Sequence, residues 1–446
     1  MRIKKEDILK LIKSPKLPIQ EFFESESTSG ILLIIAAVIA LIVANSSLSS
    51  YYFDLLHANI NIQLPFITFD KTFHHWVNDG LMTVFFLLVG MEIKRELVHG
   101  ELSSFKSALL PIVAAFGGAI LPAIIYLSLN KGTPYESGWG IPMATDIAFA
   151  VGVLTLLGPR VPLWAKIFLT AVAVVDDIIA VLVIAVFYTA ELNTTALLVS
   201  AFAILVLIFM NWKKVNSIPI YILIGIILWA AVLKSGIHAT IAGVLLGFII
   251  PVRTVIKKDE LLDDAWKGVR YLEESFSSSE TETGIKKASA LNYLSDVIIN
   301  SESPLHRLEH KLNNWVAYFI MPVFAFTNSG LVLSTEVIST AGSSTITWGI
   351  ILGLFFGKQI GIFLSTFILI FLGVTNLKVD KKTIVMLYGI SVISGIGFTM
   401  SLFISNMAFT ENADLENAKI GIIIVSLVCG MLGYLLIRLF TRKQKE

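Results

Sequence analysis

Two adjacent aspartates stand in the middle of an apolar run of this sequence. Asp176 and Asp177 are the only charged residues among the 22 that run from Ile167 to Tyr188. At about 1.5 Å per residue, a helix of that length crosses a bilayer core of roughly 30 Å. One aspartate at the centre of such a helix costs about 2.5–3.5 kcal/mol on insertion scales. Two in succession therefore indicate a functional site.

The chemistry open to such a pair is the exchange of cations and protons. Two close carboxylates in a medium of low dielectric constant cannot both stay ionised without a cation, so their titrations are coupled. A metal cation that enters the pair expels protons, and protons that arrive expel the cation. If access to the pair alternates between the two sides of a membrane, the result is antiport.

A third acid lies in a segment that proline and glycine interrupt. Asp146 follows Thr145 in WGIPMATDIAFAVGVLTLL, which also contains Pro142 and Gly152. Unwound backbone at membrane depth is tolerated where it lines a cavity or is buried in protein. The freed carbonyls and the Thr145 hydroxyl are hard oxygen ligands of the kind that a small cation prefers. The alternative is a structural kink with one buried, hydrogen-bonded acid.

One lysine lies equally deep in an apolar run. Lys358 has about a dozen mostly apolar residues on each side, in TITWGIILGLFFGKQIGIFLSTFILIFLG. From that depth its amine does not easily reach either membrane face, so it needs an acidic partner. The pair Asp176 and Asp177 supplies one. A fixed structural salt bridge is the alternative, but it leaves unexplained why there are three acids for one base.

A second glycine-rich interruption, ISGIGFTMSLFI, lies within residues 391–404. Interrupted spans in corresponding positions of two halves are typical of transporter sites near the membrane midplane. The segments around Asp146 and around this motif are therefore the expected pair. His238, in KSGIHATIAGVLLGF near an outer boundary, is interpreted first as a structural residue, with a proton-linked role as the alternative.

Composition places the chain among polytopic membrane proteins. Of its 446 residues, 55% are hydrophobic and 15% are charged, against roughly 25% charged in soluble domains. The mean hydropathy is +0.79. A net charge of +1 gives no reason to expect a nucleic-acid partner. The single cysteine, Cys429, excludes an internal disulfide.

We predict an all-α polytopic membrane protein with about 12 transmembrane helices. A cytoplasmic tail (1–29) precedes spans 1–8 (30–250), and a cytoplasmic loop (251–314) precedes spans 9–12 (315–438) and a second cytoplasmic tail (439–446). The first tail is amphipathic over residues 4–23, so it either lies on the membrane surface or is solvated. The predicted spans are 30–46, 76–93, 107–129, 139–157, 164–188, 195–211, 218–234, 236–250, 315–334, 346–372, 382–408 and 417–438.

The basic residues predict the orientation. With the N-terminus inside, the inner segments carry 29 of the 34 Lys and Arg residues, and the outer segments carry four. The positive-inside rule applies to short loops, so the nine basic residues of 251–311 are discounted. The remaining 20 inner and 4 outer basic residues predict that both termini are in the cytoplasm.

Two loops differ from the rest. The outer loop (47–75) contains HANINIQLPFITFD, whose alternation on each side of Pro65 predicts a β-hairpin. An exposed hairpin edge could pair with a second copy, which would give a homodimer. The polar loop 251–314 includes SSSETETG, whose composition predicts disorder, flanked by stretches that favour short helices. It holds no catalytic motif, so a solvated loop is the preferred interpretation.

Charged residues also gather at the inner boundaries of two spans. FLLVGMEIKREL places Glu92, Arg95 and Glu96 on one helix face. HRLEHKL brings Arg307 and Glu309 to another inner boundary. Charges in such places usually anchor helices, and a regulatory cluster is the alternative.

The combined motifs resemble those of bacterial NhaA-type sodium/proton antiporters. ATDIAFAVGVLTLLG, AVAVVDDIIAVLVIAVFYT, LKSGIHATIAGVLLGFIIP, RLEH followed by WVAY, FGKQIGI and GIGFTMS occur in that family's order, from about Gly30 to the last span. The resemblance implies inverted repeats with two crossed, broken helices, spans 4 and 11, and alternating access at the midplane. It implies electrogenic, pH-regulated export of Na+, and of Li+, in exchange for H+ across the bacterial inner membrane.

The resemblance also assigns roles. Asp177 and Asp176 would bind Na+ or Li+ in alternation with protons, and Lys358 would pair with Asp176 when sodium is absent. Asp146 and Thr145 would lie where the unwound helices cross, with Asp146 balancing the helix dipoles. The pH response would involve Glu92, Arg95, Glu96, Arg307 and Glu309. Beyond the transported ions and the lipid bilayer, no cofactor and no enzymatic activity are expected.

The sequence departs from the family pattern in places that do not touch this core. His306 stands where the pattern has a basic residue before RLEH, and Asn313-Asn314 replace a His-Pro before WVAY. The long cytoplasmic loop is also expanded. The pH at which such a protein becomes active is therefore not carried over from the resemblance.

Three other functions are compatible with membrane aspartates. A sodium-coupled solute symporter would share the fold but would need a pocket for an organic substrate. An intramembrane aspartyl protease needs its two aspartates on separate helices, typically within Gly-x-Gly-Asp, and the GIGF of this chain lacks the acid. A channel would conduct ions without coupling them to a pH gradient.

Overall fold

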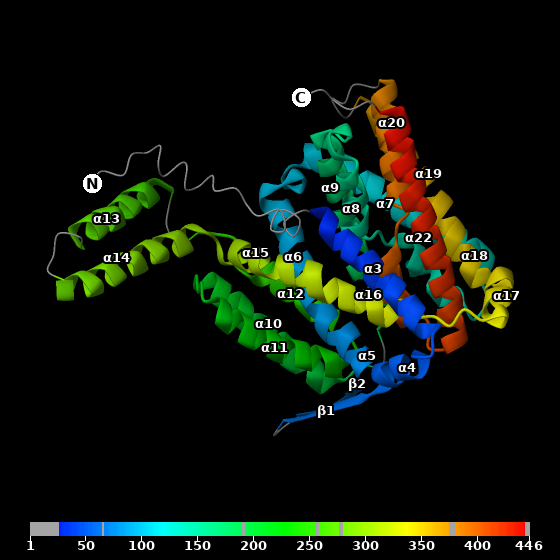
Figure 1. The fold of residues 1–446 in the computed structure, drawn as a ribbon, viewed down its shortest axis with the longest axis horizontal. Helices are drawn as coiled ribbons and strands as arrows, with labels where there is room; N and C mark the ends of the chain where they lie inside the picture. Colours follow the sequence, from blue (N-terminus) through cyan, green and yellow to red (C-terminus); the bar gives the residue numbers. More distant parts are fainter. Residues whose placement is uncertain are drawn as a thin grey trace. The chain divides into compact units, whose positions relative to one another are not determined.

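The computed structural model describes residues 26–64, 67–189, 192–254, 258–275, 280–373 and 380–441. The amphipathic stretch 4–23 lies outside the described residues. The chain is almost entirely helical (Figure 1). It divides into two compact units, one formed by residues 1–56, 109–180 and 321–446 and the other by residues 57–108 and 181–320.

The first unit contains the acids and the lysine that the sequence singles out. Its helices come from stretches far apart in the chain, and α3 packs against both α8 and α16, while α22 packs against α18, α20 and α21. The elements are α3 (Glu26–Ala44), α4 (Ser49–His57), α7 (Phe105–Asn130), η3 (Glu136–Met143), α8 (Ile147–Leu156), η4 (Gly158–Arg160), α9 (Leu163–Phe187), α16 (Met321–Ser329), α17 (Thr335–Ser343), α18 (Thr345–Leu352), η6 (Gly353–Gly357), α19 (Lys358–Phe371), α20 (Lys381–Ile393), α21 (Phe398–Ala408) and α22 (Asn412–Phe440).

The second unit combines helices with one hairpin. Its two strands are antiparallel, with pairs running from Asn59↔Thr72 to Leu64↔Ile67, and they coincide with the alternating stretches around Pro65. Its elements are β1 (Asn59–Leu64), β2 (Ile67–Thr72), α5 (Phe73–His75), η1 (Trp76–Leu81), α6 (Met82–His99), η2 (Glu101–Ser103), α10 (Thr194–Trp212), α11 (Ile218–Ser235), α12 (Thr240–Ile249), α13 (Lys258–Ser275), α14 (Glu280–Ser301), α15 (Pro304–Trp315) and η5 (Val316–Ile320).

The structure confirms an all-α polytopic membrane protein. Among the described residues, eight helices are long and apolar enough to cross a membrane, and a ninth candidate is the pair α3 and α4, bent by 112°. The other predicted spans, 76–93, 236–250 and 315–334, are short or contain π-helical turns. Length and hydropathy alone do not establish these three, so the count of twelve stays a prediction.

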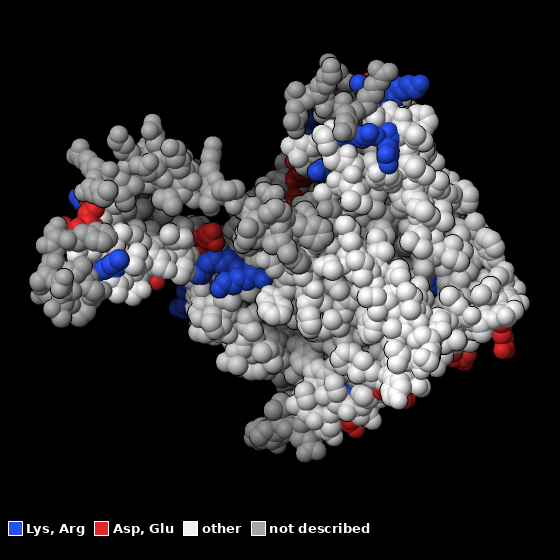
Figure 2. Space-filling model, viewed as in Figure 1, with Lys and Arg blue, Asp and Glu red and all other residues white. Residues whose placement is uncertain are grey.

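The surface of the first unit fits this assignment. Figure 2 shows few charged side chains over the middle of α3, α16 and α22, and Lys, Arg, Asp and Glu gather near helix ends. Large apolar side chains on the outside of these helices are exposed, among them Ile42 at 61% and Met431 at 60%. Such a band is expected where a helix faces lipid.

Glycines bring the helix that carries Lys358 into close contact with α7. A Cβ atom on Gly361 would collide with the carbonyl of Gly117, and one on Gly117 would collide with the carbonyl of Gly361. One turn earlier, a Cβ atom on Gly357 would lie 2.7 Å from the Cα atom of Pro122. Small residues of this kind allow membrane helices to approach closely. This contact fixes the position of α19 along α7, and so the depth of Lys358.

Candidate functional site

Two interrupted helices of the first unit meet at their interruptions. The chain is extended between η3 and α8, at Ala144 and Asp146, and α20 stops before α21 begins. The Asp146 backbone N–H donates to the Ile396 carbonyl at 2.7 Å, and the Thr145 hydroxyl donates to the Ser394 carbonyl at 3.0 Å. The backbone N–H and C=O groups that lose their helical partners at one interruption therefore form hydrogen bonds with groups at the other interruption. Buried backbone in a membrane needs such partners because no water is there to replace them.

Asp146 is the N-cap of one helix and also lies against the start of another. Its Oδ1 accepts from the backbone N–H of Phe149 in α8 at 3.0 Å. Its Oδ2 accepts from the backbone N–H of Thr399 in α21 at 3.0 Å and from the Thr399 hydroxyl at 2.6 Å. The carboxylate is buried, with 1% of the residue exposed. One negative charge thus faces the positive ends of two helix dipoles.

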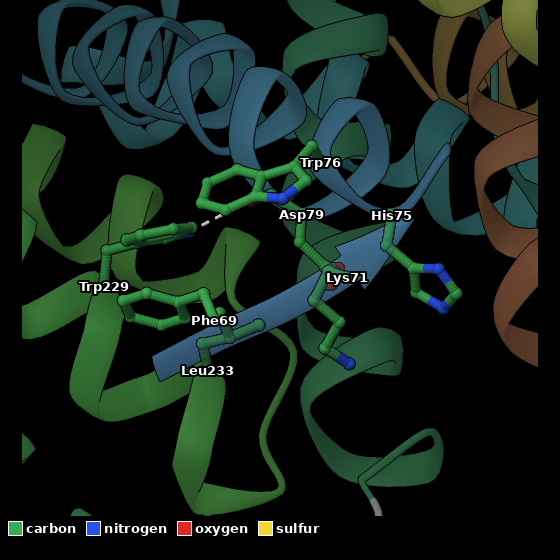
Figure 3. Close-up of a pocket in the computed structure, with 7 residues that line it drawn as sticks. All are labelled: Phe69, Lys71, His75, Trp76, Asp79, Trp229 and Leu233. Atoms are coloured by element: carbon green, nitrogen blue, oxygen red, sulfur yellow. Dashed lines mark hydrogen bonds between the residues drawn. The ribbon is translucent and has the colours of Figure 1, made fainter. Parts of the chain in front are cut away.

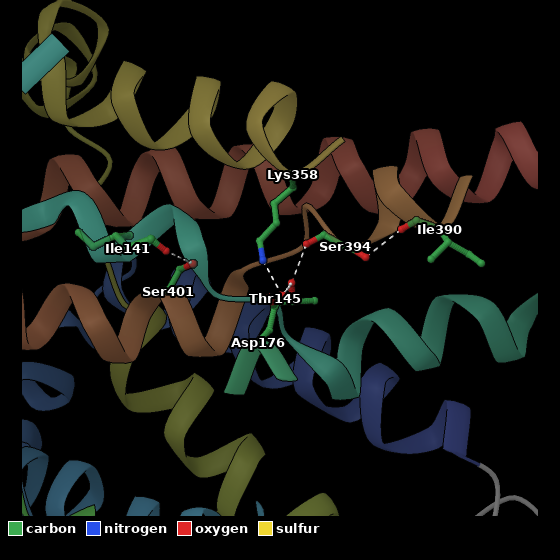
Figure 4. Close-up of polar contacts among 7 residues, drawn as sticks. All are labelled: Ile141, Thr145, Asp176, Lys358, Ile390, Ser394 and Ser401. Atoms are coloured by element: carbon green, nitrogen blue, oxygen red, sulfur yellow. Dashed lines mark hydrogen bonds and ion pairs between the residues drawn. The ribbon is translucent and has the colours of Figure 1, made fainter. Parts of the chain in front are cut away.

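Lys358, Asp176 and Thr145 form one buried cluster (Figure 4). The Lys358 ammonium donates to Asp176 Oδ2 at 2.5 Å, and the Thr145 hydroxyl, which shares its one hydrogen with the Ser394 carbonyl, donates to the same oxygen at 2.7 Å. The side chains of Lys358 and Asp176 are 0% and 1% exposed. Asp176 Oδ1 is also buried, and it has no hydrogen-bond partner among the described residues. The cluster therefore retains one carboxylate oxygen that can accept a cation or a proton.

A π-helical segment, η6, ends directly before Lys358. Such segments occur frequently at functional sites because the wider turn redirects the side chains that follow. In Figure 4 the Lys358 side chain extends from its helix toward Thr145 and Asp176.

Asp177 follows Asp176 on α9, and 2% of it is exposed. Lys419 on α22 is a buried base elsewhere in this unit. The candidate site itself consists of three buried acids, Asp146, Asp176 and Asp177, and the buried base Lys358. If all four were ionised the formal charge would be −2. The N-terminal ends of two helices offset the negative charge of Asp146. The negative charge that Lys358 does not neutralise therefore lies on Asp176 and Asp177 of α9. A hard monovalent cation or a proton is the species that such a site can accept.

The second unit brings most of the interfacial charges together. Arg95 donates to Glu309 Oε1, and its other terminal nitrogen lies 3.6 Å from Glu96 Oε1. Glu92 is close enough for the charges of Arg95, Glu96 and Glu309 to act on it. The other oxygen of Glu309 and the Nε of Arg307 are buried without hydrogen-bond partners among the described residues. These five residues from α6 and α15 are called the charged cluster below.

The same unit has a small pocket beside the hairpin (Figure 3). The ring centroids of Phe69, Trp76 and Trp229 lie 5.8–6.1 Å apart, and the Trp229 indole N–H donates to the backbone carbonyl of Asp79 at 3.0 Å. His238 is near enough to Asp79 for their charges to interact. The aromatic packing explains how the hairpin is held to α11.

Sequence reasoning did not single out Thr399 and Ser394, which complete the site. Both lie inside the ISGIGFTMSLFI stretch, but neither is charged, so the cost of membrane insertion does not mark them. A hydroxyl two residues after the last glycine of the break is the one signal that would have suggested Thr399 as a partner of Asp146.

Comparison with known proteins gives a consistent family. A family model described as Na+/H+ antiporter 1 matches residues 20–437. The Na(+)/H(+) antiporter NhaA of Oleidesulfovibrio alaskensis is 45% identical over 426 residues, which cover 95% of this chain and 94% of that protein. The Na(+)/H(+) antiporter NhaA 2 of Syntrophotalea carbinolica is 44% identical, with 94% and 95% covered. The Na(+)/H(+) antiporter NhaA of Caulobacter vibrioides is 45% identical, with 95% and 91% covered.

Proposed function

This chain belongs to the Na+/H+ antiporter 1 family, and on that premise we propose that it exchanges Na+ for H+ across a bacterial cytoplasmic membrane. The observation that carries the proposal is the buried cluster of Lys358, Asp176 and Thr145, with its unpartnered carboxylate oxygen. The family is one of transporters, so the carboxylates act on transported ions and not on a covalent substrate.

Competition for one site provides the coupling. In the described arrangement the ammonium of Lys358 neutralises Asp176. A sodium ion that binds Asp177 and Asp176 replaces this interaction and supplies the positive charge itself. The site then releases protons from Lys358 and the two carboxylates, because it cannot bury a sodium ion together with a charged ammonium and protonated carboxyl groups. The reverse sequence follows when protons return from the other side.

Thr145 and Asp146 prepare the site for this exchange. The Thr145 hydroxyl orients Asp176 by donating to Oδ2. Asp146 holds the two interruptions together and offsets the dipoles of α8 and α21. Because the segments on either side of an interruption are linked by non-helical backbone, they can shift separately, which is what alternating access requires.

Several finer properties follow from this proposal. Lithium, which is smaller and equally hard, is a second substrate. If more protons than sodium ions cross per cycle, exchange is electrogenic and the membrane potential drives it. Both termini are cytoplasmic, as the distribution of basic residues indicates. The edge of the hairpin β1–β2 supports pairing with a second copy.

The charged cluster is the proposed site of pH response. Arg95, Glu96 and Glu309 are already paired, so a change in the protonation of one member alters the balance of the others. Such a cluster at an inner boundary can sense cytoplasmic pH without touching the transported ion.

Inverted membrane vesicles test the function. Vesicles that contain the protein and carry an imposed pH gradient are expected to lose part of that gradient when Na+ is added, and not when choline is added. Asp177→Asn should abolish the response. Asp296→Asn, the same substitution at an exposed acid of α14, is the matched control and should keep it. A full response in Asp177→Asn would place the ion site elsewhere.

A further inference from the structure

A hydrogen bond joins α19 to α20 one residue after Lys358. The Tyr388 hydroxyl of α20 donates to Gln359 Oε1 of α19 at 3.1 Å. Gln359 is 5% exposed, so its amide lies between the two helices and not in the lipid. The Tyr388 ring is held by Phe363, with centroids 5.6 Å apart and an interplanar angle of 86°. Tyr388 itself is 40% exposed, so these two contacts, and not enclosure in the core, hold its phenol in place.

Stability alone does not account for a glutamine at this position. Gln359 Nε2 is buried and has no hydrogen-bond partner among the described residues. A buried amide that is only half satisfied costs free energy, whereas an apolar side chain of similar size would not.

The bond closes a ring of contacts around Asp176. Lys358, on α19, donates to Asp176 Oδ2. The Thr145 hydroxyl shares its one hydrogen between the same oxygen, at 2.7 Å, and the carbonyl of Ser394, the residue that follows α20, at 3.0 Å. Gln359 and Tyr388 join α19 and α20 directly. Both donors to Asp176 are therefore tied to the same pair of helices.

We propose that Gln359 and Tyr388 are positioning residues that hold Lys358 against Asp176, and that their hydrogen bond sets how strongly Lys358 competes with Na+ for that carboxylate. Neither residue touches the transported ion. The inference rests on the proposed Na+/H+ exchange. In this proposal Asp176 and Asp177 bind the ion, whereas α19 and α20 set how tightly Na+ is bound.

Reconstituted full-length protein tests the inference. Tyr388→Phe removes the hydroxyl and keeps the ring contact with Phe363. Because a hydrogen bond between membrane helices is worth about 0.6–1.7 kcal/mol, the apparent KM for Na+ should fall about threefold to twentyfold. The maximal rate should change much less. A general loss of folding would instead lower the maximal rate and leave KM unchanged.

A second variant and a control keep the test decisive. Gln359→Met removes the acceptor and should shift the KM for Na+ equally, and the double variant should shift it no further, because both changes remove one bond. Tyr126→Phe is the matched control: its hydroxyl donates to the Tyr135 carbonyl at 3.0 Å, outside the ring of contacts. If the KM for Na+ of Tyr388→Phe is unchanged or raised, the inference is wrong. If wild-type protein exchanges Na+ for H+ in the same assay, the proposed function still holds. Wild-type protein that exchanges no Na+ overturns both.

Discussion

Removal of the charge on Lys358 is the perturbation whose cost the structure defines best. The side chains of Lys358 and Asp176 are 0% and 1% exposed, and their charged atoms lie 2.5 Å apart. Lys358→Met keeps a long side chain but leaves the Asp176 carboxylate with the Thr145 hydroxyl as its described hydrogen-bond donor. The second oxygen of that carboxylate has no donor among the described residues to compensate.

Breaking a buried ion pair from one side costs about 3–5 kcal/mol, whereas removing both charges costs far less. Lys358→Met should therefore lower the free energy of unfolding by about 3–5 kcal/mol. Adding Asp176→Asn should recover most of this loss, because no uncompensated charge remains. The cost of the single variant reflects an isolated carboxylate and not the strength of the pair.

Thermal unfolding of purified protein in detergent, followed by the fluorescence of its 8 tryptophans, measures the effect. The Tm of Lys358→Met should lie clearly below that of wild-type protein, and the Tm of the double variant should lie near it. Two results would refute the reasoning: a single variant as stable as wild type, or a double variant no more stable than the single. Either result would mean that the stability of the protein does not depend on the charges of Lys358 and Asp176 neutralising each other.

Three further expectations concern the surroundings of the site. Asp146→Asn should lower stability by about 1–2 kcal/mol in the same unfolding assay, because the charge that caps two helices is lost. Gly361→Val should reduce the folded, monodisperse fraction on size-exclusion chromatography, since its Cβ meets the backbone of α7, while Gly342→Val, with open space around it, should not. Hydrogen bonds from the side chain and backbone of Thr383 hold the pKa of Asp380 below its usual range. The stabilisation by this carboxylate is present at neutral pH and lost as pH falls through the lowered pKa, so the Tm difference between Asp380→Ala and wild type should shrink in acid.

The charges of the site could be predicted from the sequence because their cost is local. Asp176, Asp177 and Lys358 stand in apolar runs where any ionised group is expensive. Proline and glycine similarly suggest the interruptions, since they remove or weaken helical hydrogen bonds, although α7 runs through Pro111 and Pro122 without one. The family order of the motifs then indicated ion exchange.

The contacts that organise these charges could not be predicted in the same way. Thr145 and Ser394 are 249 residues apart, and whether they meet depends on how two helices pack. The capping of two helices by Asp146 depends on the same packing. The closeness of Gly117 and Gly361 depends on the register of α7 against α19, which hydropathy does not encode. Spans with π-helical turns also remain hard to count, because length is then a poor measure of whether a segment crosses the membrane.

We propose that Na+ and protons compete for the carboxylates of Asp176 and Asp177. The most direct test is to add Na+ to purified protein in weakly buffered detergent solution and to measure the protons released. Wild-type protein should release protons with a saturable dependence on Na+ concentration, and Asp177→Asn should release none. Sodium binding without proton release by wild-type protein, or equal release by Asp177→Asn, would contradict the account.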